Sequence, residues 1–290
     1  MALLDLIKQL RDRTGAGLSD CRTALVNNGE DIEKAFDWLR EKGLAKAAKK
    51  ASRIAAEGLA ITKRCEKCGK TVIVEVNCET DFVSKGEPFH QFVDNVAGVI
   101  LKNDCADLDT AKQLTQDLFT DATVAMGEKF DLRRFAIVNQ GEGEVIGAYI
   151  HMGGKIASLV KLNGGNDELA KQIAMHIAAN SPAYLSMEHV PAEELEHEKQ
   201  VQIESAKNDP KLAGKPANVL ENILKGKINK HFAEQCLLNQ AFLMDDSKTV
   251  ETVLKEKGAS VVCYYRYAVG EGIEKRVDDF ASEVMKEVKK

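Results

Sequence analysis

The fold is decided first by residues 72–83, which read Val72-Ile-Val-Glu-Val-Asn-Cys-Glu-Thr-Asp-Phe-Val83. Valine at every second position from 72 to 76 is the period-two pattern of a β-strand. Thr80 and Asp81 then supply two residues that favour the N-cap of a helix. The spacing therefore predicts a strand, a turn and a helix in succession, with Phe82 in the first helical turn.

Phe82 admits two interpretations in that position. An apolar residue near a capped helix start often packs against the helix as a staple, which would bury the ring. Alternatively, the ring is exposed and acts as a wedge against a partner protein. The local sequence leaves both interpretations open.

The rest of the central sequence alternates between strand and helix patterns, which predicts an α+β fold. A hairpin is expected around Arg64–Gly69, and an approximate second copy of hairpin, turn and helix follows the first. The predicted strands lie at 59–64, 71–76, 133–138, 145–150, 156–162 and 259–269, and the predicted helices at 82–97, 110–126 and 167–179. We expect a core of two subdomains, with residues 58–141 in the first and residues 142–190 and 241–272 in the second.

Residues 1–43 are predicted to form three short helices, a module that resembles the ubiquitin-associated type. Asp31 is suited to cap the third helix, and Gly43 is expected to end it. A module with so small a core often serves as a docking surface, although a purely stabilising appendage remains an alternative. The alanine-rich, basic residues 44–57 are expected to be a linker.

Two further helical regions are predicted towards the C-terminus. Residues 191–240 favour an antiparallel helical hairpin inserted into the core, because Asp209-Pro210 and Gly214-Lys-Pro216 interrupt a long helical pattern. Residues 273–290 carry apolar side chains at helical spacing and predict a C-terminal helix.

Composition and charge favour a protein partner over nucleic acid or membrane. The formal charge of −5 argues against a general nucleic-acid binder, which needs a concentrated basic face. Seven cysteines without a secretory start favour free thiols in a reducing compartment, and no apolar run reaches membrane-spanning length. We expect a bacterial cytoplasmic protein.

Catalytic and cofactor motifs occur in this sequence only as incomplete patterns. Cys65-x-x-Cys68 has half of the ligand spacing of a zinc site without a second pair, so a plain hairpin and a zinc site both remain open. The glycines near 141–147 and 153–154 do not match a dinucleotide or phosphate loop, and His197-Glu198 lacks the second histidine of a metalloprotease helix. His176 lies on an apolar helix and is expected in the core. No enzyme chemistry, metal or cofactor is predicted.

The motifs of this chain resemble those of one protein family, in order and over nearly its whole length. They are Leu10-Arg-Asp-Arg-Thr-Gly-Ala-Gly17, Asp20-Cys-Arg-Thr-Ala-Leu25, Lys46-Ala-Ala-Lys-Lys50, Thr80-Asp-Phe-Val83, His151 with Gly153-Gly-Lys-Ile156, Ala174-Met-His-Ile-Ala-Ala179 and Val269-Gly-Glu-Gly-Ile-Glu-Lys275. The sequence is thereby similar to bacterial elongation factor Ts, the nucleotide-exchange factor of the translational GTPase elongation factor Tu.

The resemblance implies a function that is exerted by binding, without covalent chemistry. It implies that the chain binds elongation factor Tu in its GDP-bound and nucleotide-free forms and promotes GDP release so that GTP can bind. It assigns Thr80, Asp81, Phe82 and Val83 to dislocation of the partner's Mg²⁺, and it places His151 with Gly153 and Gly154 on the partner-facing surface. Simple packing remains an alternative for His151. A scaffold or adaptor that merely holds partners together is the rival function.

Overall fold

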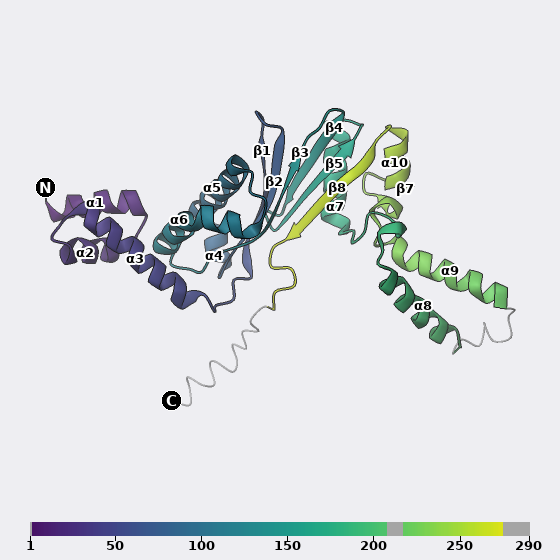
Figure 1. Cartoon of the computed structure of the whole chain (residues 1–290), viewed down its shortest axis with the longest axis horizontal. Coiled ribbons are helices and arrows are strands. Elements are labelled where there is room, and N and C mark those ends of the chain that lie inside the picture. The colour runs from purple at the N-terminus through teal and green to yellow at the C-terminus, as the bar shows by residue number, and fades with distance from the viewer. Residues whose placement is uncertain (1, 208–216, 275–290) are drawn as a thin grey trace. The chain divides into compact units, whose positions relative to one another are not determined.

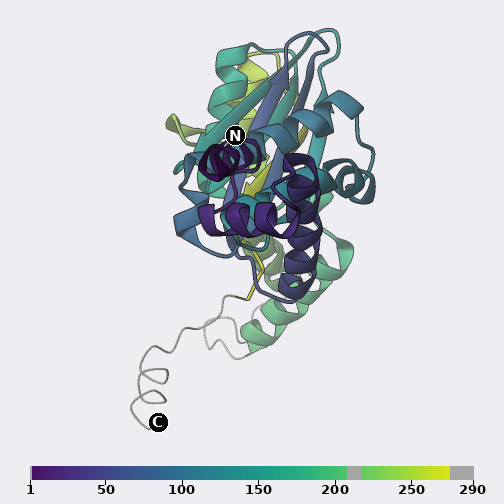
Figure 2. The same ribbon diagram turned by 90° about the vertical axis from the view of Figure 1, so that its left-hand side faces the viewer.

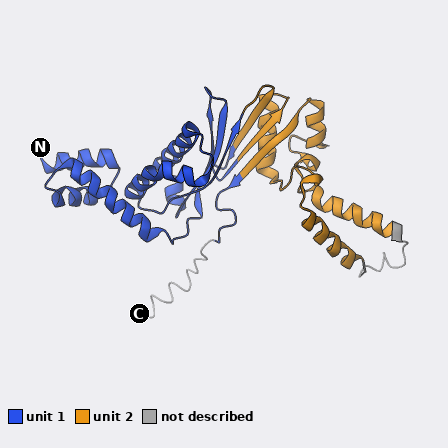
Figure 3. Cartoon of the chain, viewed as in Figure 1, with its two compact units in different colours: residues 1–139, 150–157, 267–290 blue, residues 140–149, 158–266 orange. Residues whose placement is uncertain are grey.

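The computed structural model describes residues 2–207 and 217–274. These residues combine helices with two three-stranded sheets, so the α+β class predicted from the sequence is confirmed (Figure 1). The chain divides into two compact units, of which the first contains residues 1–139, 150–157 and 267–290 and the second residues 140–149 and 158–266 (Figure 3). The predicted C-terminal helix lies almost wholly outside the described residues.

The first unit begins with three helices, α1 (Leu3–Thr14), α2 (Leu18–Asn27) and α3 (Ile32–Lys50) (Figure 2). Their shared core is small and includes the fully buried Leu10 and Leu25. Asp31 caps α3 as predicted, since its side chain accepts hydrogen bonds from two backbone N–H groups of the first turn.

The predicted end of the third helix at Gly43 was wrong, because α3 continues to Lys50 and packs on α6 (Leu108–Met126). A Cβ at Gly43 would lie 2.4 Å from Cγ2 of Val124, so glycine here allows the two helices to approach closely. Arg40 forms an ion pair with Asp117 on α6 at 2.5 Å. The proposed border between module and linker therefore falls inside a helix that packs against the core.

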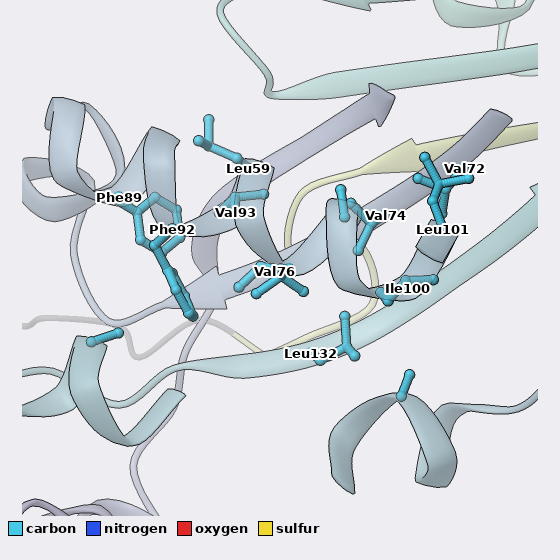
Figure 4. Close-up of a cluster of buried hydrophobic side chains, with 14 of the residues drawn as sticks. Leu59, Val72, Val74, Val76, Phe89, Phe92, Val93, Ile100, Leu101 and Leu132 are labelled. Atoms are coloured by element: carbon cyan, nitrogen blue, oxygen red, sulfur yellow. The ribbon is translucent and has the colours of Figure 1, made fainter. Parts of the chain in front are cut away.

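The core of the first unit is an antiparallel sheet in the order β1 (Glu57–Cys65), β2 (Lys70–Cys78) and β3 (Asp131–Asn139). Its apolar side chains pack with those of α5 (Glu87–Asn103) and α6, as Figure 4 shows for Val74, Val76, Phe89 and Leu132 among others. The central strand β2 is buried along nearly its whole length.

The predicted helix that begins at Phe82 is in fact two helices. The short α4 (Asp81–Ser84) has Lys85 as its C-cap, and Gly86 is the N-cap of α5. The apolar period of residues 89–96 is correct for α5 alone, and it could not reveal the break after Ser84.

A buried carboxylate attaches the end of the described chain to this sheet. Glu75 on β2 is fully buried and accepts from Arg133 Nη1 at 3.0 Å, Arg134 Nε at 2.6 Å and the backbone N–H of Gly270 at 2.9 Å. Two guanidinium groups compensate the buried charge, because charge-assisted hydrogen bonds are the strong ones. Residues 267–271, which carry part of a family motif, are thereby fixed on the sheet.

The second sheet has the order β4 (Glu144–His151), β5 (Ile156–Asn163) and β8 (Ser260–Ala268). The strands predicted at 145–150, 156–162 and 259–269 are thus confirmed to within two residues. The tip of the β4–β5 hairpin, residues 150–157, belongs to the first unit.

The second unit packs several short elements around the apolar face of α7. Its elements are α7 (Asp167–Asn180), η1 (Met187–His189), α8 (Ala192–Lys207), α9 (Ala217–Ala233), η2 (Leu237–Asn239), β6 (Ala241–Phe242), β7 (Asp245–Thr249) and α10 (Val250–Glu256). The helices α8 and α9 contact each other, and their connection at 208–216 lies outside the described residues. The second helix of the predicted hairpin was expected to run to about 238, but α9 ends at Ala233; the elements from β6 to α10 had no sequence prediction of their own. Within the described part of the chain, no helix is long and apolar enough to cross a membrane.

His176 is a core residue, as predicted, and it holds α7 to the segment after η2. It is fully buried; its Nδ1 accepts from the backbone N–H of Leu243 at 3.2 Å, and its Nε2 lies 2.9 Å from Oε1 of Gln240. Because a backbone N–H can only donate, the ring proton lies on Nε2 and is donated to Gln240. Burial lowers the pKa of His176, so the ring is neutral.

Candidate functional site

The candidate site is the turn between β2 and α4, which contains residues 80–83. Thr80 is the N-cap of α4, and its Oγ1 accepts from the backbone N–H of Val83 at 3.4 Å. Asp81, which the sequence offered as a second N-cap residue, is instead the first residue of the helix. Thr80 therefore makes the cap, and the Asp81 carboxylate takes no part in it.

Phe82 projects from this turn into solvent. Its side chain is 86% exposed, whereas Val83 is partly buried against the core of the first unit and Ser84 is fully enclosed. The interpretation of Phe82 as a buried staple is therefore wrong. The turn is anchored by Val83 and Ser84 on one side and presents an aromatic ring on the other.

Glu128 stabilises this turn through hydrogen bonds, and it was not predicted from the sequence. Its carboxylate accepts from the backbone N–H groups of Glu79 at 3.0 Å and Thr80 at 3.1 Å, and also from the Thr80 hydroxyl. Glu128 directly follows Gly127, the left-handed C-cap of α6, so the end of that helix aims the carboxylate at the turn. A half-buried glutamate 48 residues away carries no local sequence signal, because only the fold brings it here.

Glu79 connects the same turn to the end of the N-terminal helices. Its carboxylate accepts from the backbone N–H of Lys129 at 2.7 Å and pairs with Arg53 at 3.0 Å. The ammonium group of Lys129 in turn donates to the backbone carbonyls of Ala51 and Arg53, each at 2.7 Å. The turn, the end of α6 and the chain after α3 thus form one polar cluster.

The charges beside Phe82 are exposed. Asp81 pairs with Lys85 one helical turn later at 2.6 Å. The hydrogen bond from Lys85 lowers the pKa of Asp81, and the same contact raises the pKa of Lys85. Such an exposed pair adds little stability, so the two groups can exchange partners at small cost.

The Cys78 thiol offers no nucleophile at this turn. It donates to the carbonyl of Thr80 at 3.2 Å, and burial raises its pKa to about 12. A thiol in this state is not ionised near neutral pH and is therefore unreactive.

The second predicted segment is the tip of the β4–β5 hairpin. His151 and Gly153 are exposed, and Gly154 is buried with its carbonyl accepting from Ala60 N–H on β1 at 2.8 Å. At Gly154 φ is +94°, and an added Cβ would lie 2.6 Å from Cδ2 of Leu59. Only glycine combines this conformation with such close approach to β1.

The structure brings both segments to one end of the β1–β2 ladder. Lys155 pairs with Glu57 at 2.6 Å, and Glu57 lies opposite Cys78, two residues before Thr80. The charge of Lys155 is also among the causes that lower the pKa of Asp81. The two segments therefore share an electrostatic environment although residues 84–150 separate them in sequence.

Met152 is a further residue of this tip that sequence reasoning missed. Its side chain is 69% exposed, and its φ of 50° is unusual for a residue other than glycine. Like Phe82, it is a large apolar side chain held in solvent by a tight turn.

Comparison with protein families supplies the deciding observation. The family model described as Elongation factor TS matches residues 79–271, which is 193 of the 290 residues. The chain belongs to the elongation factor Ts family. Membership implies a translation elongation factor that acts as a nucleotide-exchange factor for elongation factor Tu, without covalent chemistry of its own.

The elongation factor Ts match includes both segments of the candidate site. It begins one residue before Thr80, and it contains Glu128 and the turn from His151 to Lys155. The N-terminal helices and the Cys65–Cys68 hairpin lie before it. Among residues 2–207 and 217–274, no group of three or more His, Cys, Asp or Glu side chains is arranged to hold a metal ion.

Proposed function

We propose that this protein releases GDP from elongation factor Tu by inserting Phe82 into the GTPase and displacing the groups that order its Mg²⁺. GTPases hold their nucleotide partly through a metal ion that bridges the β- and γ-phosphate oxygens, and in the GDP state the ion contacts the remaining phosphates. A ring that occupies the space of those groups favours an opened nucleotide site. GTP then binds as the exchange factor leaves.

The observation that carries this proposal is the 86% exposure of Phe82 on an anchored turn. Full burial of a phenylalanine side chain is favourable by about 1.5–3 kcal/mol, so a partner that buries the exposed ring gains this free energy on binding. A ring on a mobile loop would lose part of that gain when it became ordered. The contacts of Glu128 with Thr80 reduce that loss by holding the turn before binding.

The hairpin tip is proposed as the second contact of the same surface. His151, Met152 and Gly153 are exposed there, and the buried Gly154 fixes their position against β1. An apolar Met152 and an adjacent imidazole suit a partner surface of mixed polarity. We assign them to binding, while Phe82 acts on the nucleotide site.

The N-terminal helices are proposed as a separate docking surface. Leu4, Leu18 and Val26 on α1 and α2 are 61%, 52% and 57% exposed, respectively, although each is apolar. Their burial against the GTPase would contribute binding free energy without touching the nucleotide site. Variants of these residues should weaken the affinity and leave the maximal exchange rate unchanged.

Exchange by this mechanism requires differential binding. A partner shifts an equilibrium only by as much as it prefers one state over the other, so the chain must bind the opened GTPase more tightly than the closed one. An adaptor would bind both states equally and leave GDP dissociation unchanged.

Stopped-flow release of a fluorescent GDP from elongation factor Tu tests the proposal. We expect the dissociation rate to rise with the concentration of this protein and to saturate, because a complex forms before GDP leaves. A dissociation rate that stays constant, with binding of the pair verified in parallel, would favour the adaptor function.

A further inference from the structure

Two cysteines lie three residues apart at the turn that joins β1 to β2. Cys65 is the last residue of β1, Cys68 lies within the turn, and Gly69 precedes β2. Cys68 is exposed and Cys65 is half-exposed. This hairpin lies before the region that matches the family, and the proposed exchange mechanism assigns no role to the pair.

The backbone of the turn holds the two thiols close together. The N–H of Gly69 donates to the carbonyl of Cys65 at 3.1 Å, and Sγ of Cys68 lies 4.0 Å from the same carbonyl oxygen. An i to i+4 hydrogen bond winds the chain into one helical turn, which places residues three apart on the same side. Their Cα separation in such a turn is below about 7 Å, close to the span of roughly 4.4–6.8 Å that a disulfide requires.

The local electrostatics favour the thiolate of Cys65. A hydrogen bond from the Cys68 side chain, followed by one from the Cys68 backbone, lowers the pKa of Cys65, and the charge of Lys67 acts in the same direction. The thiolate is the reactive form of cysteine in disulfide exchange. By contrast, burial raises the pKa of the other cysteines for which the structure shows a shift: Cys21, Cys78, Cys105, Cys236 and Cys263.

We propose that Cys65 and Cys68 are a reversible dithiol–disulfide pair that reacts with low-molecular-weight disulfides. The Cys65 thiolate attacks one sulfur of the small disulfide, forms a mixed disulfide and releases one small thiolate. The Cys68 thiolate then attacks Sγ of Cys65 and releases the second small thiolate, and the two protons of the protein thiols pass to these leaving groups. The dithiol loses two electrons, and the small disulfide gains them.

Oxidation at this turn should leave nucleotide exchange unchanged. Cys65 and Cys68 lie at one end of the β1–β2 ladder, and Thr80 follows the other end at Cys78. The eight residue steps from Lys70 to Cys78 span about 27 Å of strand. The inference is therefore independent of the proposed function, and each can fail without the other.

The test equilibrates the full-length protein with defined ratios of reduced to oxidised glutathione, then alkylates free thiols and measures intact and peptide masses. We expect Cys65 and Cys68 to lose their labels together, with a loss of two hydrogen masses and an intramolecular cross-link. Reduction should reverse the change. The GDP-release rate should differ less than about twofold between the two forms.

Three variants make the result specific. Cys68→Ser should stop the reaction at a glutathione adduct on Cys65, and Cys65→Ser should slow adduct formation because the favoured thiolate is gone. Cys263→Ser is the matched control and should behave as the unsubstituted protein, because the Cys263 thiol is partly buried and its pKa is raised.

Two results would overturn the proposal. One is full labelling of both cysteines, or cross-linking between chains, at every glutathione ratio. The other is a bound metal. If the protein retains one zinc ion per chain after incubation with zinc alone, if this ion protects both thiols from alkylation, and if glutathione forms no disulfide, the pair is a metal-binding site.

Discussion

Replacement of Phe82 by alanine distinguishes two roles for this side chain, an exposed wedge that acts on the partner and a residue that stabilises the core of this protein. The ring is 86% exposed, so a partner that encloses it buries most of a phenylalanine side chain. Full burial is worth about 1.5–3 kcal/mol, and the exposed share therefore corresponds to about 1.3–2.6 kcal/mol. If that free energy is gained only in the opened complex, Phe82→Ala should slow GDP release by about 10-fold to 80-fold at saturation.

The same substitution should hardly affect folding. Surface substitutions usually change the free energy of unfolding by less than about 0.5 kcal/mol, whereas truncation of a buried phenylalanine costs about 3–5 kcal/mol. Phe89, which is fully buried in the core of the first unit, is the matched comparison. We expect Phe82→Ala to melt within about 2 °C of the unsubstituted protein and Phe89→Ala to melt far lower.

The assay measures fluorescent GDP release from elongation factor Tu by stopped flow, with thermal melting of each variant in parallel. Leu114→Ala, at an apolar position that is 48% exposed on α6, controls for the loss of any exposed apolar group and should leave the rate unchanged. A Phe82→Ala protein that melts normally and releases GDP at the full rate would refute the wedge.

Three further predictions concern the residues that support the site and the core. Glu128→Gln should slow GDP release by about tenfold while the protein stays folded, because a loss of about 1.5 kcal/mol in charge-assisted hydrogen bonding loosens the turn, and an unchanged rate would show that the carboxylate is not needed. Gly154→Ala should lower the free energy of unfolding by about 1–3 kcal/mol in a denaturant titration, and by more than Gly153→Ala, where an added Cβ meets nothing within 4 Å; equal effects would contradict the close approach to β1. The pKa of His176 is lowered from 6.5 in the folded state, so its contribution to the free energy of unfolding is complete above pH 6.5 and falls as the pH drops below that value. His176→Gln should therefore make the free energy of unfolding depend less on pH in unfolding curves measured from pH 7.5 to 5.

Sequence periodicity predicted the elements whose packing repeats regularly. The valines of β2 and the apolar side chains of α5 repeat with the periods of a strand and a helix, and both elements were predicted, although the helix was expected to begin at Phe82 and α5 begins at Glu87. Residues 80–83 were singled out from sequence as a turn with a capping residue followed by an aromatic, and their functional role was implied only by the family resemblance. The exposure of Phe82 was not predictable, since a buried staple and an exposed wedge share the same sequence pattern.

Features that depend on contacts between distant residues had no local signal. Glu128 reaches Thr80 only because α6 ends beside the turn, and Gly43 interrupts no helix because it packs against Val124. Met152 is exposed through a left-handed turn that its residue type does not favour. In each case tertiary structure overrides the propensity of the individual residue.

The central claim, that this protein prefers an opened form of elongation factor Tu, is tested most directly by calorimetric titration of the pair with and without saturating Mg²⁺-GDP. Thermodynamic linkage makes the effect reciprocal: if this protein lowers the GTPase's affinity for nucleotide, bound nucleotide lowers the GTPase's affinity for this protein by the same ratio. We expect tight binding to the nucleotide-free GTPase, much weaker binding with Mg²⁺-GDP, and a smaller difference when Mg²⁺ is chelated, each tenfold change being worth about 1.4 kcal/mol. Equal affinities with and without Mg²⁺-GDP would contradict exchange by differential binding.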